Sequence, residues 1–336
     1  MAWASINGAD IYYELHEPSD GAAQGPVETL VFAHGAGGSH LSWWQQVPYF
    51  SRAYRCLAFD QRGFGKSTAG GEAGLDTLTQ DLTALLDHLH VEQAYLVGQS
   101  LGGRPCMGVT VTEPGRVKAL IMADTIFGMA ESEAALREHR AANEGVTLES
   151  GAYSARLRAE QPLLAFLYDE IRALNPLRNP PRVDAAAAHD SRFAGTPERL
   201  AGLDVPVLFV AGADDALVPP AIMRAAAKLI PHARYEEVAG CGHSVYFENA
   251  PAFNGLLERF LSAVERGVWD VSQMNLTPAA QSQWERLQVA GLQPFALTCS
   301  CGKSFVSPGS ADGMLEELWL AEHYGREGHA VRSFEG

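Results

Sequence analysis

Short apolar runs alternate with longer amphipathic segments over the first two thirds of this sequence. The runs combine aliphatic, aromatic and β-branched residues, which is typical of buried strands, and they occupy residues 28–33, 54–59, 94–97 and 119–123. Between the second and third runs, leucines recur every three or four positions, at Leu78, Leu82, Leu85, Leu86 and Leu89. Such spacing gives a helix one apolar face that can lie on a sheet. The alternation of strand with helix predicts an α/β fold in which helices flank a mostly parallel sheet.

The strand pattern stops between about residues 125 and 201. Ala, Leu, Glu and Arg dominate this segment, and helices are predicted within 133–143 and 152–173. The strand signal returns at 205–210 and 233–238. We therefore expect a helical cap inserted between two strands of the sheet.

This order of elements predicts three parts. Residues 1–265 form one α/β domain that contains the cap and ends with a helix over 252–264. Residues 266–294 are mostly polar and are interpreted as a linker, with one helix around 281–289. Residues 295–336 form a small module rich in Cys, Gly and His.

Composition narrows the class of protein. With 47% hydrophobic and 19% charged residues the chain suits a folded α/β protein, and its 33 Gly and 18 Pro fit many tight turns. The net charge is −15 and no run of Lys or Arg offsets it, which argues against nucleic acid as a partner. The first residues have neither a basic start nor an apolar run, so we expect no signal peptide, no membrane partner and a cytoplasmic location. Five cysteines in a chain of this length do not make a disulfide framework.

The most informative chemical motif is Gly-Gln-Ser-Leu-Gly at residues 98–102. It follows the run that ends at Val97 and precedes a segment able to begin a helix. A sharp strand-to-helix turn exposes its central side chain and tolerates only small residues at the two glycine positions. We therefore interpret Ser100 as a nucleophile.

A serine hydroxyl needs a base that takes its proton and an acid that holds the base in the right tautomer. His243 lies in a glycine-flanked loop after the last predicted strand of the sheet and is the candidate base. Asp214 and Asp215 follow the strand that ends at Val210, at the same edge of the sheet. We predict that Asp215 bonds His243, because Asp214 is suited to the turn itself.

These motifs, in this order, resemble the α/β-hydrolase fold family in the branch that carries a helical cap. The resemblance covers about residues 1–265 and includes a glycine-rich loop at 34–38 and the Asp-Gln-Arg-Gly-Phe-Gly-Lys-Ser loop at 60–67. In the family's pattern the acid falls on Asp215, while a few members keep it at the position of Asp124, which stays open as the alternative. The resemblance implies that the 60–67 loop is structural, and this loop lacks the spacing of a phosphate-binding P-loop.

A serine nucleophile also needs donors for the negative oxygen that forms when Ser100 attacks a carbonyl. The backbone N–H of Leu101, directly after the nucleophile, is one predicted donor. The glycine-rich loop after His34 is expected to supply the other donor, from Ala36. These two N–H groups would form the oxyanion hole.

The C-terminal module carries a second candidate site. Cys299 and Cys301, followed by His323 and His329, offer two thiolates and two imidazoles, a set that suits a tetrahedral zinc ion. The Cys-x-Cys spacing is tighter than the common Cys-x-x-Cys, and a redox-active dithiol or plain packing are the alternatives. Four protein ligands leave no open position, so this zinc would be structural.

The sequence thus predicts a serine hydrolase that cleaves a carboxylic ester or lactone through an acyl-enzyme, without a cofactor for catalysis. Its partner is a small-molecule substrate, and the apolar residues from Leu163 to Tyr168 in the cap suggest an apolar acyl or ring portion. A carbon–carbon bond hydrolase of the meta-cleavage type is the nearer alternative, with Arg104 as the candidate cation for a substrate carboxylate. A non-catalytic ligand-binding module is the farther one. The oligomeric state stays open, with a homo-oligomer among the alternatives.

Overall fold

A computed structural model describes residues 2–18, 27–70, 74–142, 146–175 and 192–266, together with residues 269, 282–283, 286, 295–299, 304–307 and 331–335. The chain divides into two compact units, Met1–Glu258 and Arg259–Gly336. The helix α11 (Ala250–Glu265) crosses this boundary and includes the helix predicted over 252–264. Most of the predicted linker helix around residues 281–289 lies outside the described residues.

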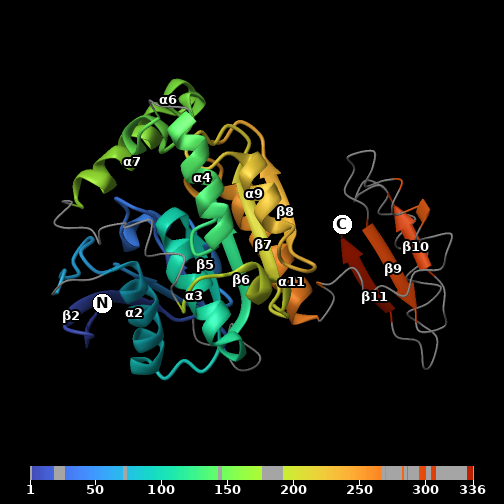
Figure 1. Ribbon diagram of the computed structural model, residues 1–336, viewed down its shortest axis with the longest axis horizontal. Helices are drawn as coiled ribbons and strands as arrows, with labels where there is room; N and C mark the ends of the chain where they lie inside the picture. Colours follow the sequence, from blue (N-terminus) through green and yellow to red (C-terminus); the bar gives the residue numbers. More distant parts are fainter. Residues whose placement is uncertain are drawn as a thin grey trace. The chain divides into compact units, whose positions relative to one another are not determined.

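The first unit is built on an eight-stranded sheet (Figure 1). Its strands are β1 (Ala2–Ile6), β2 (Ala9–His16), β3 (Thr29–Ala33), β4 (Arg55–Phe59), β5 (Ala94–Gln99), β6 (Val117–Ala123), β7 (Val207–Gly212) and β8 (Arg234–Val238). They lie side by side in the order β1-β2-β4-β3-β5-β6-β7-β8. β2 pairs antiparallel with β1 and with β4, and all other neighbours are parallel.

The mostly parallel α/β fold predicted from the sequence is confirmed. All six predicted strands, β3 to β8, are present with small shifts at their ends. The sequence analysis missed β1 and β2. β1 is an antiparallel edge strand in which buried and exposed side chains mostly alternate, so it lacks the continuous apolar run of the buried parallel strands.

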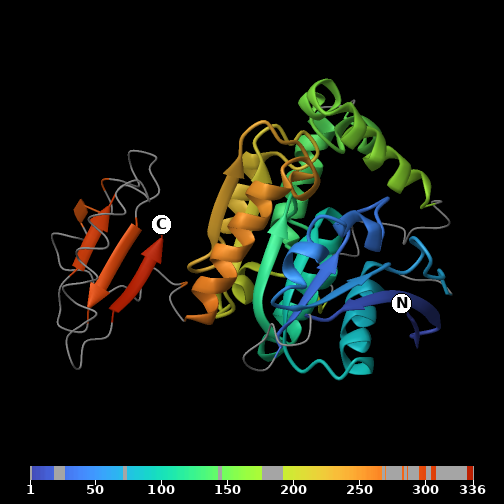
Figure 2. The ribbon, with the colours of Figure 1, turned by 180° about the vertical axis from the view of Figure 1, so that it is seen from behind.

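Helices cover both faces of the sheet. α2 (Leu75–His88), α3 (Gly103–Thr112) and α9 (Pro220–Ala227) lie on the face toward the viewer in Figure 1. α11 lies on the other face, which Figure 2 turns forward. The predicted leucine face belongs to α2, where Leu78, Leu82, Leu85 and Leu86 are buried.

Successive side chains of one strand pack alternately into the hydrophobic cores on the two faces of the sheet. Val31 of β3 belongs to the core that also contains side chains of α2, α3 and α9. The next residue, Phe32, packs on Trp43, with the ring centroids 5.0 Å apart. Trp43 in turn contacts Tyr246 at 4.7 Å between centroids. This two-sided burial explains the unbroken apolar runs of the parallel strands.

The described residues of the helical insert between β6 and β7 form α4 (Ala130–Ala142), α5 (Leu148–Gly151), α6 (Ala155–Glu160), α7 (Pro162–Ala173) and α8 (Pro197–Ala201). In Figure 1, α6 and α7 stand beyond the edge of the sheet at which the parallel strands end. The segment predicted to be helical at 152–173 contains two helices, α6 and α7. The chain leaves helical geometry at Gln161, and Pro162 occupies the first turn of α7, where a missing N–H costs nothing.

The outer face of α7 does not form the apolar substrate site that the sequence suggested. Leu163 is 85% exposed and Phe166 is 63% exposed, so these side chains do not line an apolar substrate pocket. Tyr168 and Ile171 point the other way and line a small cavity beside the glycine-rich loop. The helix period separates the two sets, because residues three or four positions apart share a face.

The second unit contains a three-stranded antiparallel sheet that the sequence analysis did not predict. β9 (Phe295–Cys299) lies between β10 (Ser304–Ser307) and β11 (Val331–Glu335). Cys299 is the last residue of β9 and pairs with Val331. The other predicted zinc ligands, Cys301, His323 and His329, lie outside the described residues.

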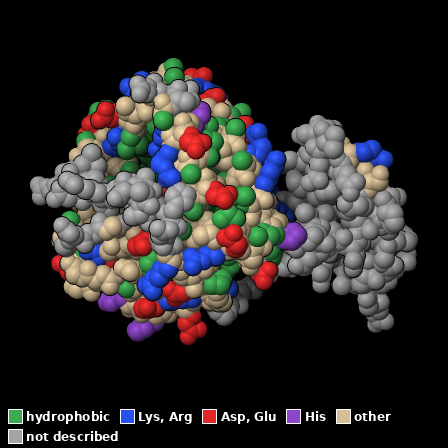
Figure 3. All heavy atoms as spheres, viewed as in Figure 1, with side chains coloured by type: hydrophobic (Ala, Val, Ile, Leu, Met, Phe, Trp, Pro, Cys, Tyr) green, Lys and Arg blue, Asp and Glu red, His purple; other side chains and the backbone are tan. Residues whose placement is uncertain are grey.

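The surface drawn in Figure 3 mixes acidic, basic and hydrophobic side chains over the described part of the first unit. Among the helices that the structure describes, none combines the length and the apolar character that a membrane span needs.

Candidate active site

Ser100 lies at the sharp turn between β5 and α3, the first residue of a short 3-10 helix (Ser100–Gly102). Its φ of +48° is a left-handed conformation that side chains with a Cβ rarely adopt. The backbone carbonyl of Ser100 accepts a hydrogen bond from Thr125 Oγ1 at 2.7 Å, which fastens this turn to the end of β6. The strained position is therefore held by contacts from outside the turn.

The two glycines of the motif are required by close backbone contacts. A Cβ on Gly98 would lie 2.5 Å from the carbonyl oxygen of Gly102. A Cβ on Gly102 would lie 2.0 Å from the carbonyl oxygen of Ala33, in the neighbouring strand β3. No side chain fits at either position, so the Gly-x-Ser-x-Gly spacing follows from the geometry of the turn.

Ser100, His243 and Asp215 form one chain of hydrogen bonds. His243 Nε2 lies 2.8 Å from Ser100 Oγ, and His243 Nδ1 lies 2.8 Å from Asp215 Oδ2. All three side chains are buried. The structure therefore brings together the three residues that the sequence singled out from three separate loops.

The loop that carries His243 is tied to its surroundings on two sides. The backbone carbonyl of His243 accepts a hydrogen bond from Gln99 Nε2 at 2.8 Å, so the residue before Ser100 holds the base. Glu248 accepts backbone N–H groups of Gly242 and Ser154 through its two carboxylate oxygens, each at 2.9 Å. Ser154 belongs to the helical insert, so Glu248 connects the insert to the His243 loop. Sequence reasoning did not find Gln99 or Glu248 as supporting residues, because their partners are more than five positions away along the chain.

The two candidate acids have different partners. Asp215 uses Oδ2 for His243, and its Oδ1 accepts the backbone N–H groups of Leu217 (2.8 Å) and Val218 (2.9 Å). Asp124 accepts the N–H of Gly212 at 2.9 Å and that of Val245 at 3.0 Å. Asp124 thus fastens the end of β7 to α10 (Val245–Glu248) and has no hydrogen bond to the imidazole.

Burial and neighbouring charges shift the pKa values of His243 and Asp124. Burial alone would lower the pKa of His243, but the charge and hydrogen bond of Asp215, with a contribution from Asp124, outweigh it and raise the pKa above its ordinary value. Burial, followed by repulsion from Asp215, raises the pKa of Asp124 well above that of a free carboxyl group. The imidazole therefore sits in a negative field that favours its protonated form.

The residues predicted for the oxyanion hole are neighbours in space. Leu101 packs in a small cluster with Phe64 and Leu78, and Ala36 contacts the same cluster. Ala36 also lines a cavity of about 10 Å³, together with Gln99 and residues of α7. Gly35 borders Ser100, since a Cβ on Gly35 would lie 2.9 Å from Ser100 Cβ. The cavity thus adjoins the nucleophile on the side of the glycine-rich loop.

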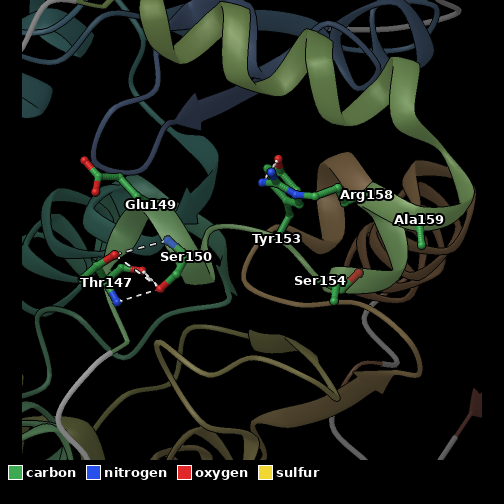
Figure 4. A pocket seen from close by; sticks show the side chains of 8 residues that line it. Thr147, Glu149, Ser150, Tyr153, Ser154, Arg158 and Ala159 are labelled. Atoms are coloured by element: carbon green, nitrogen blue, oxygen red, sulfur yellow. Dashed lines mark hydrogen bonds between the residues drawn. The ribbon is translucent and has the colours of Figure 1, made fainter.

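A larger hollow of about 650 Å³ belongs to the helical insert (Figure 4). Its described lining is polar and comes from α5, α6 and the residues between them, with Arg158 donating a hydrogen bond to the Tyr153 hydroxyl. Figure 4 shows these two side chains side by side and the hydrogen bonds between Thr147 and Ser150. The hollow is not the reaction site, because Ser100, His243 and Asp215 are absent from its lining.

Arg104 does not fit the role considered for it. It lies in α3, is buried, and forms an ion pair with Glu133 of α4. A guanidinium already paired with a carboxylate is not free to bind a substrate anion. The ion pair joins α3 of the sheet domain to α4, the first helix of the insert.

The 60–67 loop is held by its own polar contacts. Asp60 Oδ1 accepts hydrogen bonds from the backbone N–H (2.6 Å) and Nδ1 (2.8 Å) of His40, and its Oδ2 accepts the N–H of Lys66 at 2.7 Å. Burial would raise the pKa of Asp60, but the His40 hydrogen bond and neighbouring positive charge keep the pKa low. These contacts stabilise the loop beside the elbow.

The three cysteines of the first unit are buried and free. Burial raises the pKa of the Cys241 thiol to about 12, and it raises that of Cys106 as well, so both stay protonated and inert. Within the part of the chain that the structure describes, no cluster of three or more His, Cys, Asp or Glu side chains could hold a metal ion.

Comparison with known proteins identifies the family of this chain. The family model for the alpha/beta hydrolase fold matches residues 28–250. The 3-oxoadipate enol-lactonase 2 of Acinetobacter baylyi is 31% identical over 73% of this chain and 91% of that protein. The 2-hydroxy-6-oxononadienedioate/2-hydroxy-6-oxononatrienedioate hydrolase of Cupriavidus pinatubonensis is 26% identical over 77% of this chain and 94% of its own length. Among solved structures, Est816, an N-acyl homoserine lactone degrading enzyme, is 28% identical with a TM-score of 0.61, over 77% of this chain and 99% of Est816. The chain belongs to the α/β-hydrolase fold family and is a hydrolytic enzyme.

Proposed function

We propose that this enzyme hydrolyses a carboxylic ester or lactone, with Ser100 as nucleophile, His243 as general base and Asp215 as the acid that orients the base. The observation that carries the proposal is the unbroken hydrogen-bond chain from Ser100 Oγ through the imidazole to Asp215. A binding module would have no need of a buried, strained serine in contact with a base.

In the first half of the reaction, His243 Nε2 takes the proton as Ser100 Oγ attacks the carbonyl carbon. The Asp215 carboxylate stabilises the imidazolium that forms and keeps Nδ1 protonated. The backbone N–H groups of Leu101 and Ala36 are the proposed donors to the negative oxygen. His243 then returns its proton to the leaving alcohol, which departs and leaves an acyl-enzyme on Ser100.

In the second half, water replaces the alcohol. His243 takes a proton from the water as its oxygen attacks the acyl-enzyme, and the second tetrahedral intermediate is held by the same two donors. Collapse of the intermediate releases the acid, and the proton returns to Ser100. For a lactone the leaving alcohol stays attached to the acyl chain, so one ring-opened hydroxy acid is the product.

The helical insert is proposed to act as a cap that shapes the acyl site. Tyr168 and Ile171 of α7 line the same cavity as Ala36 and Gln99 of the sheet domain, which supports this role. The cavity of about 10 Å³ holds roughly one water molecule. An acyl group is larger than this, so the proposed site must widen when the substrate binds.

Hydrolysis of p-nitrophenyl butanoate tests the assignment. Ser100→Ala is expected to lower kcat at least about 1,000-fold, because the nucleophile and its base act as a unit. The surface variant Ser5→Ala is the matched control and should keep full activity. A fluorophosphonate probe should label the wild type and Ser5→Ala but not Ser100→Ala. Unchanged turnover in Ser100→Ala would reject the proposed nucleophile.

For the C-terminal unit we propose a structural zinc ion bound by Cys299, Cys301, His323 and His329. Two Cys and two His side chains are a ligand set that tetrahedral zinc sites use, and this supports the proposal. Such an ion would hold residues near β9 to residues before β11, which are adjacent strands. It takes no part in the hydrolysis.

A further inference from the structure

Arg172, in the last turn of α7, places a positive charge beside the glycine-rich loop. Its Nε lies 3.4 Å from the position that a Cβ on Gly37 would occupy. The side chain lines the small cavity together with Ala36, Gln99, Tyr168 and others. Sequence reasoning missed Arg172, because nothing in the helical pattern of the insert distinguishes it from the other arginines.

We propose that Arg172 binds a carboxylate that the substrate carries in addition to its ester or lactone bond. The inference rests on the proposed hydrolysis at Ser100 and narrows its substrates to anionic esters and lactones, such as derivatives of dicarboxylic acids. Arg172 would be a specificity-determining residue, since it touches the substrate away from the bond that breaks.

Asn175, and not the side chain of Arg172 itself, holds this end of α7 in place. Asn175, three residues later, is buried and donates from Nδ2 to the carbonyl oxygen of Gly38 at 2.8 Å. Its Oδ1 accepts the backbone N–H of Gly65 at 2.6 Å. Asn175 thus fastens the end of α7 to both loops beside the elbow, and Arg172 is three residues earlier, in the last turn of the helix.

The charge of Arg172 is uncompensated within the described residues. The structure gives its guanidinium no hydrogen bond or ion pair there, whereas Arg62, Arg104 and Arg116 each pair with a carboxylate. The guanidinium of Arg172 faces the cavity beside the nucleophile without a carboxylate partner among the described residues.

The lining of the cavity leaves Arg172 as its one charged side chain among the described residues. Burial raises the pKa of Tyr168 to about 12 and raises that of Tyr246 as well, so both phenols stay neutral at physiological pH. The rest of the described lining is apolar or uncharged. A carboxylate entering this site would meet a positive charge and no competing negative one.

The guanidinium group suits this ligand chemically. Its planar fork of N–H donors matches the two oxygens of a carboxylate, and the match is stronger where water is excluded. One structural alternative exists, because a cation in the last turn of a helix also interacts favourably with the helix dipole. That effect would stabilise α7 but would not discriminate between substrates.

Two sets of esters test the proposal. In the first, mono-p-nitrophenyl esters of succinate, glutarate and adipate are compared with p-nitrophenyl esters of the uncharged acids of equal chain length. In the second, 4-(butanoyloxy)butanoic acid is compared with pentyl butanoate, so that the carboxylate lies on the alcohol side. The kinetic constants are measured for wild type, Arg172→Gln, Arg172→Lys and the control Arg158→Gln, whose arginine contacts Tyr153 in the insert.

The wild type is expected to prefer at least one anionic ester over its neutral partner by about 10- to 100-fold in kcat/KM. Arg172→Gln should lose this preference through a higher KM while its kcat for the neutral ester stays within a few-fold. Arg172→Lys should keep part of the preference, and Arg158→Gln should keep all of it. Adipate should inhibit the wild type more strongly than hexanoate, and Arg172→Gln should abolish that difference.

Absence of any anionic preference in the wild type would overturn the inference, as would an equal loss on anionic and neutral esters in Arg172→Gln. Either result leaves the proposed function standing if Ser100→Ala still abolishes hydrolysis of the neutral ester. Hydrolysis that does not depend on Ser100 would instead reject the proposed function itself.

Discussion

Asp215 contacts His243 through one carboxylate oxygen and holds its own loop through the other. The Oδ2–Nδ1 distance is 2.8 Å, and Oδ1 accepts two backbone N–H groups of the following turn. The carboxylate therefore cannot rotate away from the imidazole without losing those two hydrogen bonds. This double attachment fixes both the orientation and the tautomer of His243.

Replacing each acid by its amide separates their roles. Asp215→Asn is expected to lower kcat by about 10⁴-fold, as in other serine triads, because the amide favours the wrong imidazole tautomer. Asp124→Asn should lower kcat less than about 10-fold, since Asp124 has no hydrogen bond to His243. It should lower the free energy of unfolding by about 1 to 3 kcal/mol, because one of two backbone N–H groups loses its acceptor. Ester hydrolysis and urea denaturation check both effects, and the reverse order of kcat losses would make Asp124 the triad acid.

The pH dependence of kcat/KM follows from the raised pKa of His243. Catalysis requires the neutral imidazole, so kcat/KM should rise with pH through a midpoint above about 6.5, the ordinary histidine value. Because Asp124 contributes to the raised pKa of His243, Asp124→Asn should move this midpoint to lower pH. A wild-type midpoint at or below 6.5 would contradict the predicted influence of the two carboxylates.

The elbow glycines should not tolerate a methyl group. Gly102→Ala is expected to lower the free energy of unfolding by at least about 2 kcal/mol, because its Cβ would lie 2.0 Å from a backbone oxygen of β3 that cannot move independently. Gly115→Ala is the matched control, since no atom lies within 4 Å of its added Cβ. Urea denaturation of the two variants should differ clearly, and equal stability would show that the turn can relax.

Metal analysis tests the proposed zinc site. Protein purified without chelators should contain about one zinc ion per chain. The double variant Cys299→Ser, Cys301→Ser should contain none, and Cys56→Ala, which changes a buried cysteine in β4, should keep it. Metal-free wild-type protein would reject the site, and ester hydrolysis should be unaffected by zinc removal in any case.

Much of the fold could be predicted because its signals are local. The parallel strands are buried on both faces and appear as unbroken apolar runs, and α2 shows its leucine stripe directly. β1, β2 and the three strands described in the second unit were missed; β1, at the edge of the sheet, mostly alternates buried and exposed side chains. The break at Gln161 between α6 and α7 was also missed, although Pro162 was a visible signal for a helix start.

The sequence by itself determined the order of the parallel strands β3 to β8, the place of the helical insert and the glycines that the elbow requires, because each depends on residues close together along the chain. It also singled out Ser100, His243 and two aspartates that follow strands at one edge of a parallel sheet. Only the tertiary structure decided which aspartate contacts the imidazole, that Arg104 is already paired, and that Arg172 stands beside the glycine-rich loop. Those contacts join residues far apart in the chain. They depend on how the loops, the helical insert and the sheet pack together, and no local sequence pattern encodes that packing.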